Sequence, residues 1–391
     1  MGKLHTLAIQ SYPVYYYPPA VNVFKECVVD VNPAVAEMSK IRYGFERSTT
    51  DYHDLFEDDK TTAVVVATPN FLHKPIVLDA IKAGKNVFCE KPLAMTADDA
   101  WEMYEAAQKA GVIHAVGHNN RALSGIRFIK KMIDEGKFGK IYSIQMRYIQ
   151  SWGMDPEAPM QWRFDASKAG TGTLGDTGSH ALDIGRYLLG NIKRVSSLNS
   201  TFVKERNVAA GALLSKVPDK DQITGRQKVD VDDDTKSVVE FESGVTGFLW
   251  SSRFCIGQED TLDIEIYGSE GAAKFSRERP NEVQVVFKSD GDELRGFRTI
   301  KMGPAHPNGE LWPMADLGVG YVEQKCVEYK AFFDAIANDD PSLVSCSFYD
   351  GFKVCQVVDA IKKSSETGNW EYIDNEMIME VVKYGKNYES S

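Results

Sequence analysis

The sequence predicts an α/β protein in two parts: an N-terminal parallel sheet covered by helices, and a C-terminal α+β part with a large, mostly antiparallel, open-faced sheet. Three observations support this. Short apolar runs alternate with helical patterns over the first 120 residues. Beyond them, segments of alternating polarity follow one another, separated by turn residues. The length of 391 residues suits more than one domain. We therefore expect domains at residues 1–120 and 121–391.

The N-terminal part is expected to hold five short strands. Apolar runs bounded by turn residues are typical of buried strands, and helical patterns between them imply a parallel sheet with helices on both faces. Gly84 and Gly111 are typical helix ends. We expect strands at Leu7–Ile9, Cys27–Val29, Ala63–Ala67, Val87–Cys89 and Ile113–Val116, and helices at 33–44, 73–84 and 96–111.

The stretch between the first two expected strands is unusual. Dinucleotide-binding folds carry a glycine-rich turn there, but this sequence has no glycine between Gly2 and Gly44. Residues 10–24 contain three prolines, which lack the N–H group that a helix or a phosphate nest uses. We expect Gln10–Phe24 to be an irregular loop that holds a pyrophosphate weakly. Either the loop binds a cofactor in an altered way, or that binding has been lost.

The C-terminal part is expected to be a sheet with helices on one face. Its other face should remain open, and large apolar residues in the strand at 246–255 then predict a homo-oligomer that forms through the sheet. The polar segment 217–234 is expected to be an exposed loop. Expected helices lie at 124–139, 178–190 and 349–368, and expected strands at 140–152, 195–203, 235–243, 245–254, 261–269 and 282–289.

Composition excludes several kinds of partner. The net charge of -11 argues against nucleic acid and against anionic membrane surfaces. No apolar run is long enough to span a bilayer, and no secretory signal is evident. The six scattered cysteines suit reduced thiols in the cytoplasm. The seven histidines lack the paired spacing of metal ligands, so we expect no metal.

Several polar residues follow expected strands, where ligands bind on parallel sheets. Asp30 could accept the ribose hydroxyls of a dinucleotide or cap the next helix. Lys91 points into a cleft or into solvent. Asp176 and His180 are four residues apart, so a helix would place them on one face, where the acid could orient the imidazole. A metal pair and a buried structural histidine are the alternatives.

Three ordered motifs resemble the Gfo/Idh/MocA family of nicotinamide-dependent sugar and cyclitol oxidoreductases. They are "ATPNFLH", "EKPLA" and "GDTGSHALD", at 67–73, 90–94 and 175–183. Residues 148–172 resemble the branch that acts on free sugars, anhydrosugars and glycosides. The resemblance implies a Rossmann-like N-terminal domain, NAD as cofactor, and reversible oxidation of a secondary hydroxyl of a sugar or glycoside.

The resemblance also implies which residues form the site. The family's catalytic Lys, Asp and His match Lys91, Asp176 and His180. The family's G-x-N-Y-R segment reads Gly117-His118-Asn119-Asn120-Arg121, so an asparagine replaces its tyrosine. The candidate cofactor-binding residues are Ser11, Asp30, Thr68, Asn70, His73, Glu90, Lys91, Trp162 and Arg163, and the candidate substrate-binding residues are Asn119, Asn120, Arg121, Gln150, Asp176 and His180.

Two alternative functions remain open at this stage. Transient oxidation of one sugar carbon acidifies the neighbouring C–H, which would permit an NAD-dependent lyase or glycosidase reaction. A sugar-binding or scaffold protein with a degenerate cofactor loop is a non-enzymatic alternative.

Overall fold

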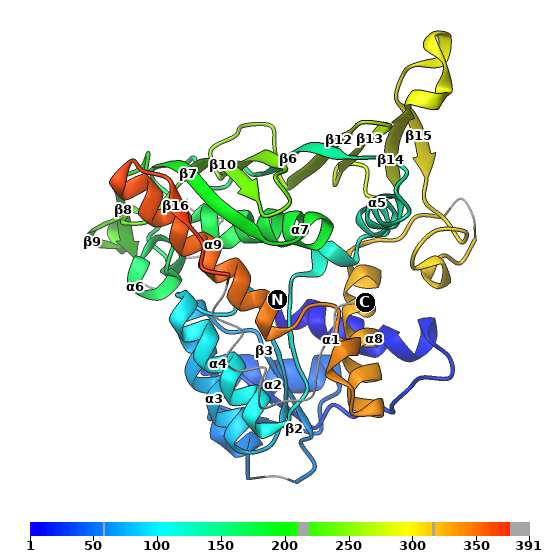
Figure 1. The fold of residues 1–391 in the computed structure, drawn as a ribbon. Helices are drawn as coiled ribbons and strands as arrows, with labels where there is room; N and C mark the ends of the chain where they lie inside the picture. The colour runs from blue at the N-terminus through cyan, green and yellow to red at the C-terminus, as the bar shows by residue number, and fades with distance from the viewer. Residues whose placement is uncertain (58, 210–218, 315–316, 376–391) are drawn as a thin grey trace.

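A computed structural model describes residues 1–57, 59–209, 219–314 and 317–375 of the chain. It has a helix-covered parallel sheet in its N-terminal third and a large mixed sheet beyond it, with helix α9 (Phe348–Thr367) between the two (Figure 1). The expected fold class is therefore confirmed. Within the described ranges, no helix is long and apolar enough to cross a membrane.

From residue 27 onward the expected strands and helices of the N-terminal part are present, and one strand that was not expected, at Arg47–Thr49, lies between the first two expected strands that remain. The strands of this part fall into a parallel pair, β1 with β2, and a parallel set of three, β3-β4-β5. No described strand pairs with both β1 and β3. The elements are β1 (Cys27–Val29), α2 (Pro33–Tyr43), β2 (Arg47–Thr49), β3 (Ala63–Val66), α3 (His73–Lys82), β4 (Asn86–Cys89), α4 (Ala97–Ala110) and β5 (His114–Val116).

The start of the chain differs from the expectation. Residues Gly2–Tyr15 form helix α1, so the predicted strand at Leu7–Ile9 is wrong. The predicted irregular loop at 10–24 is wrong as far as Tyr15, and only the rest is irregular. Ala8 and Tyr12 lie four apart and are buried, and the Tyr12 ring packs 4.9 Å from that of Phe333. Tertiary packing on the C-terminal helix α8 (Tyr321–Asn338) therefore decides the conformation of this segment.

The C-terminal sheet has nine strands in the order β15-β14-β13-β12-β6-β11-β10-β7-β16. All neighbours pair antiparallel except β6 and β11, which are parallel. Helices α5, α7 and α9 lie on one side of it (Figure 1). The bounds are β6 (Ile141–Ile149), β7 (Ile192–Ser200), β10 (Asp234–Phe241), β11 (Thr246–Ser252), β12 (Thr261–Gly268), β13 (Gly271–Ser276), β14 (Glu282–Phe287), β15 (Arg298–Lys301), β16 (Glu371–Tyr372), α5 (Ser124–Asp134) and α7 (Ser179–Leu189).

A short hairpin, β8 (Glu205–Ala209) with β9 (Ile223–Lys228), stands apart from the main sheet. The predicted exposed loop at 217–234 is therefore wrong where β9 lies. Residues 217 and 218 of that loop lie outside the described residues. The side chains of β9 are largely exposed, so no apolar alternation marks this strand in the sequence. The short helix α6 (Ala166–Ala169) lies near the same end of the sheet (Figure 1).

The helices α8 and α9 connect the two parts of the molecule. Tyr329 and Phe333 of α8 share a buried cluster with α1, and Phe348 and Phe352 of α9 share one with β3, β4 and α4. The C-terminal helices thus complete the cores around the N-terminal sheet.

Candidate active site

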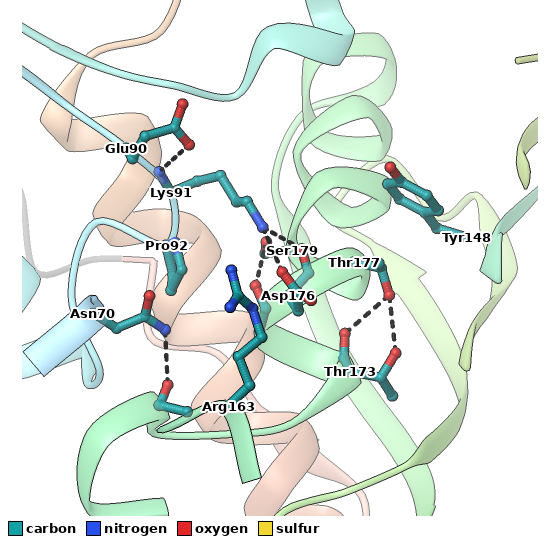
Figure 2. A network of polar contacts seen from close by, with 12 residues as sticks. Asn70, Glu90, Lys91, Pro92, Tyr148, Arg163, Thr173, Asp176, Thr177 and Ser179 are labelled. Carbon is teal, nitrogen blue, oxygen red and sulfur yellow. Dashed lines mark hydrogen bonds and ion pairs between the residues drawn. The ribbon is translucent and has the colours of Figure 1, made fainter. Parts of the chain in front are cut away.

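Lys91 links the two parts of the candidate site. It follows β4, and its Nζ donates to the carbonyl oxygen of Asp176 at 2.5 Å and to the Asp176 Oδ1 at 2.9 Å (Figure 2). The Lys91 side chain is only 15% exposed. The structure therefore brings the predicted Lys of the N-terminal part into direct contact with the predicted Asp of the C-terminal part.

His180 and Asp176 do not form the expected hydrogen-bonded pair. Asp176 lies in a single π-helical turn, Leu174–Gly178, and His180 lies in the first turn of α7. In a π-helix the repeat is wider than in an α-helix, so residues four apart no longer stand above one another. The Nδ1 atom of His180 is buried and has no hydrogen-bond partner in the structure.

Burial and charge set the protonation states of this group. Burial, reinforced by Lys91, lowers the pKa of His180 well below its usual value. Burial alone would raise the pKa of Asp176, but Lys91 and Arg163 outweigh it and lower that pKa. At neutral pH the site therefore holds a neutral imidazole beside a carboxylate paired with an ammonium group.

A second imidazole, which the sequence analysis did not single out, faces His180. The rings of His118 and His180 lie 5.5 Å apart between centroids, at right angles. His118 is buried, and neither of its ring nitrogens has a partner. Polar side-chain atoms of Asn119 and Asn120, two predicted substrate residues, are also buried and unpartnered. Buried polar atoms are normally paired, so this concentration beside His180 marks a place for a polar ligand.

Arg121 has a different environment from these asparagines. Its Nε donates to Asp183 at 2.9 Å and its Nη1 to the carbonyl oxygen of Ser345 at 2.8 Å, and a second nitrogen also contacts Asp183. The predicted substrate residue thus has its guanidinium occupied by the protein and ties α7 to the segment before α9.

Glu90, a predicted cofactor residue, is likewise engaged inside the protein. Its Oε1 lies 3.0 Å from Lys325 Nζ and 2.9 Å from His5 Nε2. Lys325 also contacts Glu328 at 3.2 Å. Burial alone would raise the pKa of Glu90, but Lys325 and His5 hold it well below its usual range. We call Glu90, Lys325, Glu328 and His5 the buried ionic cluster; it supports the turn that carries Lys91.

The remaining predicted cofactor residues are spread along the carboxyl edge of the N-terminal strands. Asp30 follows β1, and its Oδ1 accepts from Asn32 N at 2.9 Å. The Thr68 hydroxyl, after β3, is buried and unpartnered. Asn70 donates to the Ala169 carbonyl at 2.9 Å. Both ring nitrogens of His73 contact backbone carbonyls, of Pro92 and Thr68.

Ser11 lies in the third turn of α1, not at the end of a strand. Ser11 was a cofactor-binding candidate because it was expected in a loop after the first strand, so this candidate rested on the wrong element. One turn from the start of the same helix, His5 contacts Glu90. The N-terminus of α1 consequently lies at the carboxyl edge of the sheet.

Gln150, Trp162 and Arg163 come from the C-terminal part. The guanidinium of Arg163 packs 4.4 Å from the Trp162 ring centre. Figure 2 shows Arg163 near Asp176, on the side of Asn70. Gln150 Nε2 donates to Asp260 at 2.9 Å. In the part of the chain that the structure describes, no group of three His, Cys, Asp or Glu side chains is arranged to hold a metal ion.

Comparison with known proteins identifies the relatives of this site. Residues 21–118 match the family described as "Oxidoreductase family, NAD-binding Rossmann fold", and residues 126–274 match the "GFO/IDH/MocA C-terminal domain". Levoglucosan dehydrogenase of Pseudarthrobacter phenanthrenivorans is 39% identical over 371 residues, which cover 95% of each protein. The chain belongs to the Gfo/Idh/MocA family. It is an NAD-dependent oxidoreductase by that membership.

One further relative and one solved structure extend the comparison. Myo-inositol 2-dehydrogenase of Thermotoga maritima is 29% identical, over 78% of this chain and 88% of its own length. The solved structure titled "Levoglucosan dehydrogenase, complex with NADH and levoglucosan" has a TM-score of 0.89 and 38% identity, and the match covers 96% of each chain.

The residues present fit the family's cofactor. The carboxylate of Asp30 follows β1, and the buried hydroxyl of Thr68 after β3 has no partner, so both are polar groups that a dinucleotide can bind.

Proposed function

We propose that this protein oxidises a secondary hydroxyl group of a sugar or glycoside with NAD, and that Lys91, Asp176 and His180 carry the reaction. The observation that carries the proposal is the direct contact of Lys91 with Asp176, next to a buried neutral imidazole. Lys91 lies 85 residues before Asp176 in the sequence, and the direct contact of these two side chains, near unpartnered polar atoms, supports the proposal.

Each side chain has a distinct part in this proposal. The imidazole of His180 accepts the hydroxyl proton, because it is neutral and buried at neutral pH. Lys91 stabilises negative charge that develops on the substrate oxygen, and Asp176 holds Lys91 in place. Asn119 and Asn120 bind neighbouring hydroxyl groups. When bound, NAD supplies the acceptor for the hydride that leaves the same carbon.

Residues 1–120 form the cofactor domain in this proposal, and 121–391 supply the substrate side and the oligomer contact. Asp30 favours NAD over NADP, because its carboxylate repels a 2′-phosphate. Trp162 and Arg163 approach the nicotinamide side, where Arg163 faces Asp176. A cytoplasmic location suits the six free cysteines.

An assay for NADH formation tests this proposal. Levoglucosan, myo-inositol and simple glycosides are offered with NAD and with NADP. We expect NADH from at least one neutral sugar, and Lys91→Met should lower kcat by about 100-fold or more. Lys74→Met is the matched control, because Lys74 makes only surface ion pairs, with Asp99 and Glu102.

The assay also distinguishes the alternatives. Consumption of a glycoside without net NADH would favour the lyase or glycosidase reaction. Sugar binding without either reaction would favour the sensor or scaffold.

A further inference from the structure

A polar cluster stands beside His180, away from Lys91. Tyr148, near the end of β6, places its ring centre 5.9 Å from that of His180. Figure 2 shows Tyr148 on the other side of Asp176 from Glu90 and Pro92. The site therefore has a second wall, built from the large sheet, that the reaction proposed above does not use.

The side chains of this wall are hydrogen-bonded or ion-paired to one another. The Tyr148 hydroxyl donates to Asp260 Oδ1 at 2.7 Å and accepts from Arg277 Nη1 at 2.7 Å. Arg277 Nη2 lies 3.1 Å from Asp260 Oδ2. Gln150 donates to the same carboxylate, and the Trp152 indole N–H donates to Gln150 at 2.7 Å. We call Tyr148, Asp260 and Arg277 the distal cluster.

Asp260 is the member of the distal cluster that reaches solvent. The Asp260 side chain is 46% exposed, whereas that of Arg277 is 13% exposed. Carboxylate oxygens accept hydrogen bonds from hydroxyl groups, and the Gln150 amide offers both donor and acceptor atoms. A ligand that reaches from His180 towards Asp260 thus meets groups that suit several hydroxyls.

The charges on this side of His180 balance. Arg277 is paired with Asp260, and Lys91 is paired with Asp176. Both nearby imidazoles are neutral at pH 7, because burial lowers their pKa values. The further cation near Asp176, Arg163, lies on the side of Asn70 and packs on Trp162 (Figure 2). A phosphate or carboxylate group next to Asp260 would meet a negative charge before it met a cation.

We propose that the distal cluster binds the sugar hydroxyls remote from the oxidised carbon, and that Asp260 makes the site select uncharged sugars over sugar phosphates and sugar acids. This inference rests on the proposed function, because it assigns the substrate class of the same site. Neutralising Asp260 would leave Arg277 as an unpaired cation and weaken the preference for uncharged sugars.

Asp260→Asn tests this directly, because the change removes a charge and keeps the shape. The neutral sugar that the wild type oxidises best is compared with its 6-phosphate or its uronic acid. We expect kcat/KM for the neutral sugar to fall at least 10-fold, mainly through KM, because the contact is remote from the reacting carbon. The preference for neutral over anionic sugar should fall at least 10-fold as well. Titration calorimetry measures the same two sugars as Kd values.

Glu259→Gln is the matched control. Glu259 is the preceding residue, carries the same charge, is exposed, and accepts a hydrogen bond from Ser151 Oγ at 3.2 Å. Its variant should keep the wild-type preference. Arg277→Gln should weaken neutral sugar binding without improving anion binding. Thermal unfolding of each variant checks that it folds.

The outcomes separate this inference from the proposed function. An Asp260→Asn variant that keeps its preference, or one that matches Glu259→Gln, would overturn the inference and leave the function standing. A wild type that oxidises no sugar would overturn the function, and the Kd values of a neutral sugar that binds and of its 6-phosphate would still decide the inference.

Discussion

His180 shows how the surroundings of a side chain set its protonation state. It is buried beside Lys91, and both features favour the neutral ring. The family resemblance was sufficient to predict His180, Lys91 and Asp176 as candidate site residues. The environment could not be predicted, because the facing His118 and the wall at Tyr148 come from other segments of the chain, which only the fold brings to His180.

The pH dependence of turnover tests the assignment of His180. A pKa lowered in the folded protein keeps the basic form populated as pH falls, so the acidic limb of kcat/KM should lie below pH 6.5, the usual histidine pKa. His180→Asn should lower kcat by about 100-fold or more and abolish that limb. His118→Asn, which alters the neighbouring imidazole, should keep the limb. Turnover of His180→Asn close to the wild-type value would contradict the assignment.

Helices α1 and α8 are two elements that the sequence analysis did not predict. The strands at 27–29, 63–66 and 86–89 were predictable, because each is an apolar run between turn signals. The run at 7–9 is too short to tell a strand from a buried helix turn. In α8, the buried face carries Gln324, Lys325 and Glu328, so polar residues interrupt its apolar pattern. No sequence expectation covered it for that reason.

The buried ionic cluster predicts unequal effects for two lysines of α8. Lys325→Met would leave Glu90 and Glu328 buried without their cation, and should lower the free energy of unfolding by about 3–5 kcal/mol. Lys330→Met removes a partly exposed pair with Asp334 and should change it by less than about 1 kcal/mol. Chemical denaturation of both variants measures the difference. Equal effects would mean that the cluster contributes no more than a surface pair.

The whole molecule is held together by elements from both ends of the chain. The open face of the nine-stranded sheet follows from the same architecture, because its helices all lie on one side. Val238 and Phe248 are cross-strand partners on that open face, and Leu198 lies on the same face. The sequence predicted such a face from its alternating strands, but not which side chains meet on it.

Apolar residues on the open face support the proposed homo-oligomer, and Phe248 is 60% exposed in the single chain. Phe248→Asp should shift the protein to a smaller assembly, measured by analytical ultracentrifugation. Leu294→Asp places the same charge on an apolar residue that is 71% exposed outside the sheet, and should leave the assembly unchanged. A wild type that sediments as a monomer would contradict the proposal.

The contact of α1 with α8 has a consequence for the time at which the protein can fold. His5 and Tyr329 are hydrogen-bonded at 2.7 Å, although 324 residues separate them. At a synthesis rate of about 5–20 residues per second, α8 emerges roughly 15–65 s after α1. During that interval Ala8 and Tyr12 lack the surface that buries them. Folding of the N-terminal third during translation therefore cannot be completed until the C-terminal helices have been made.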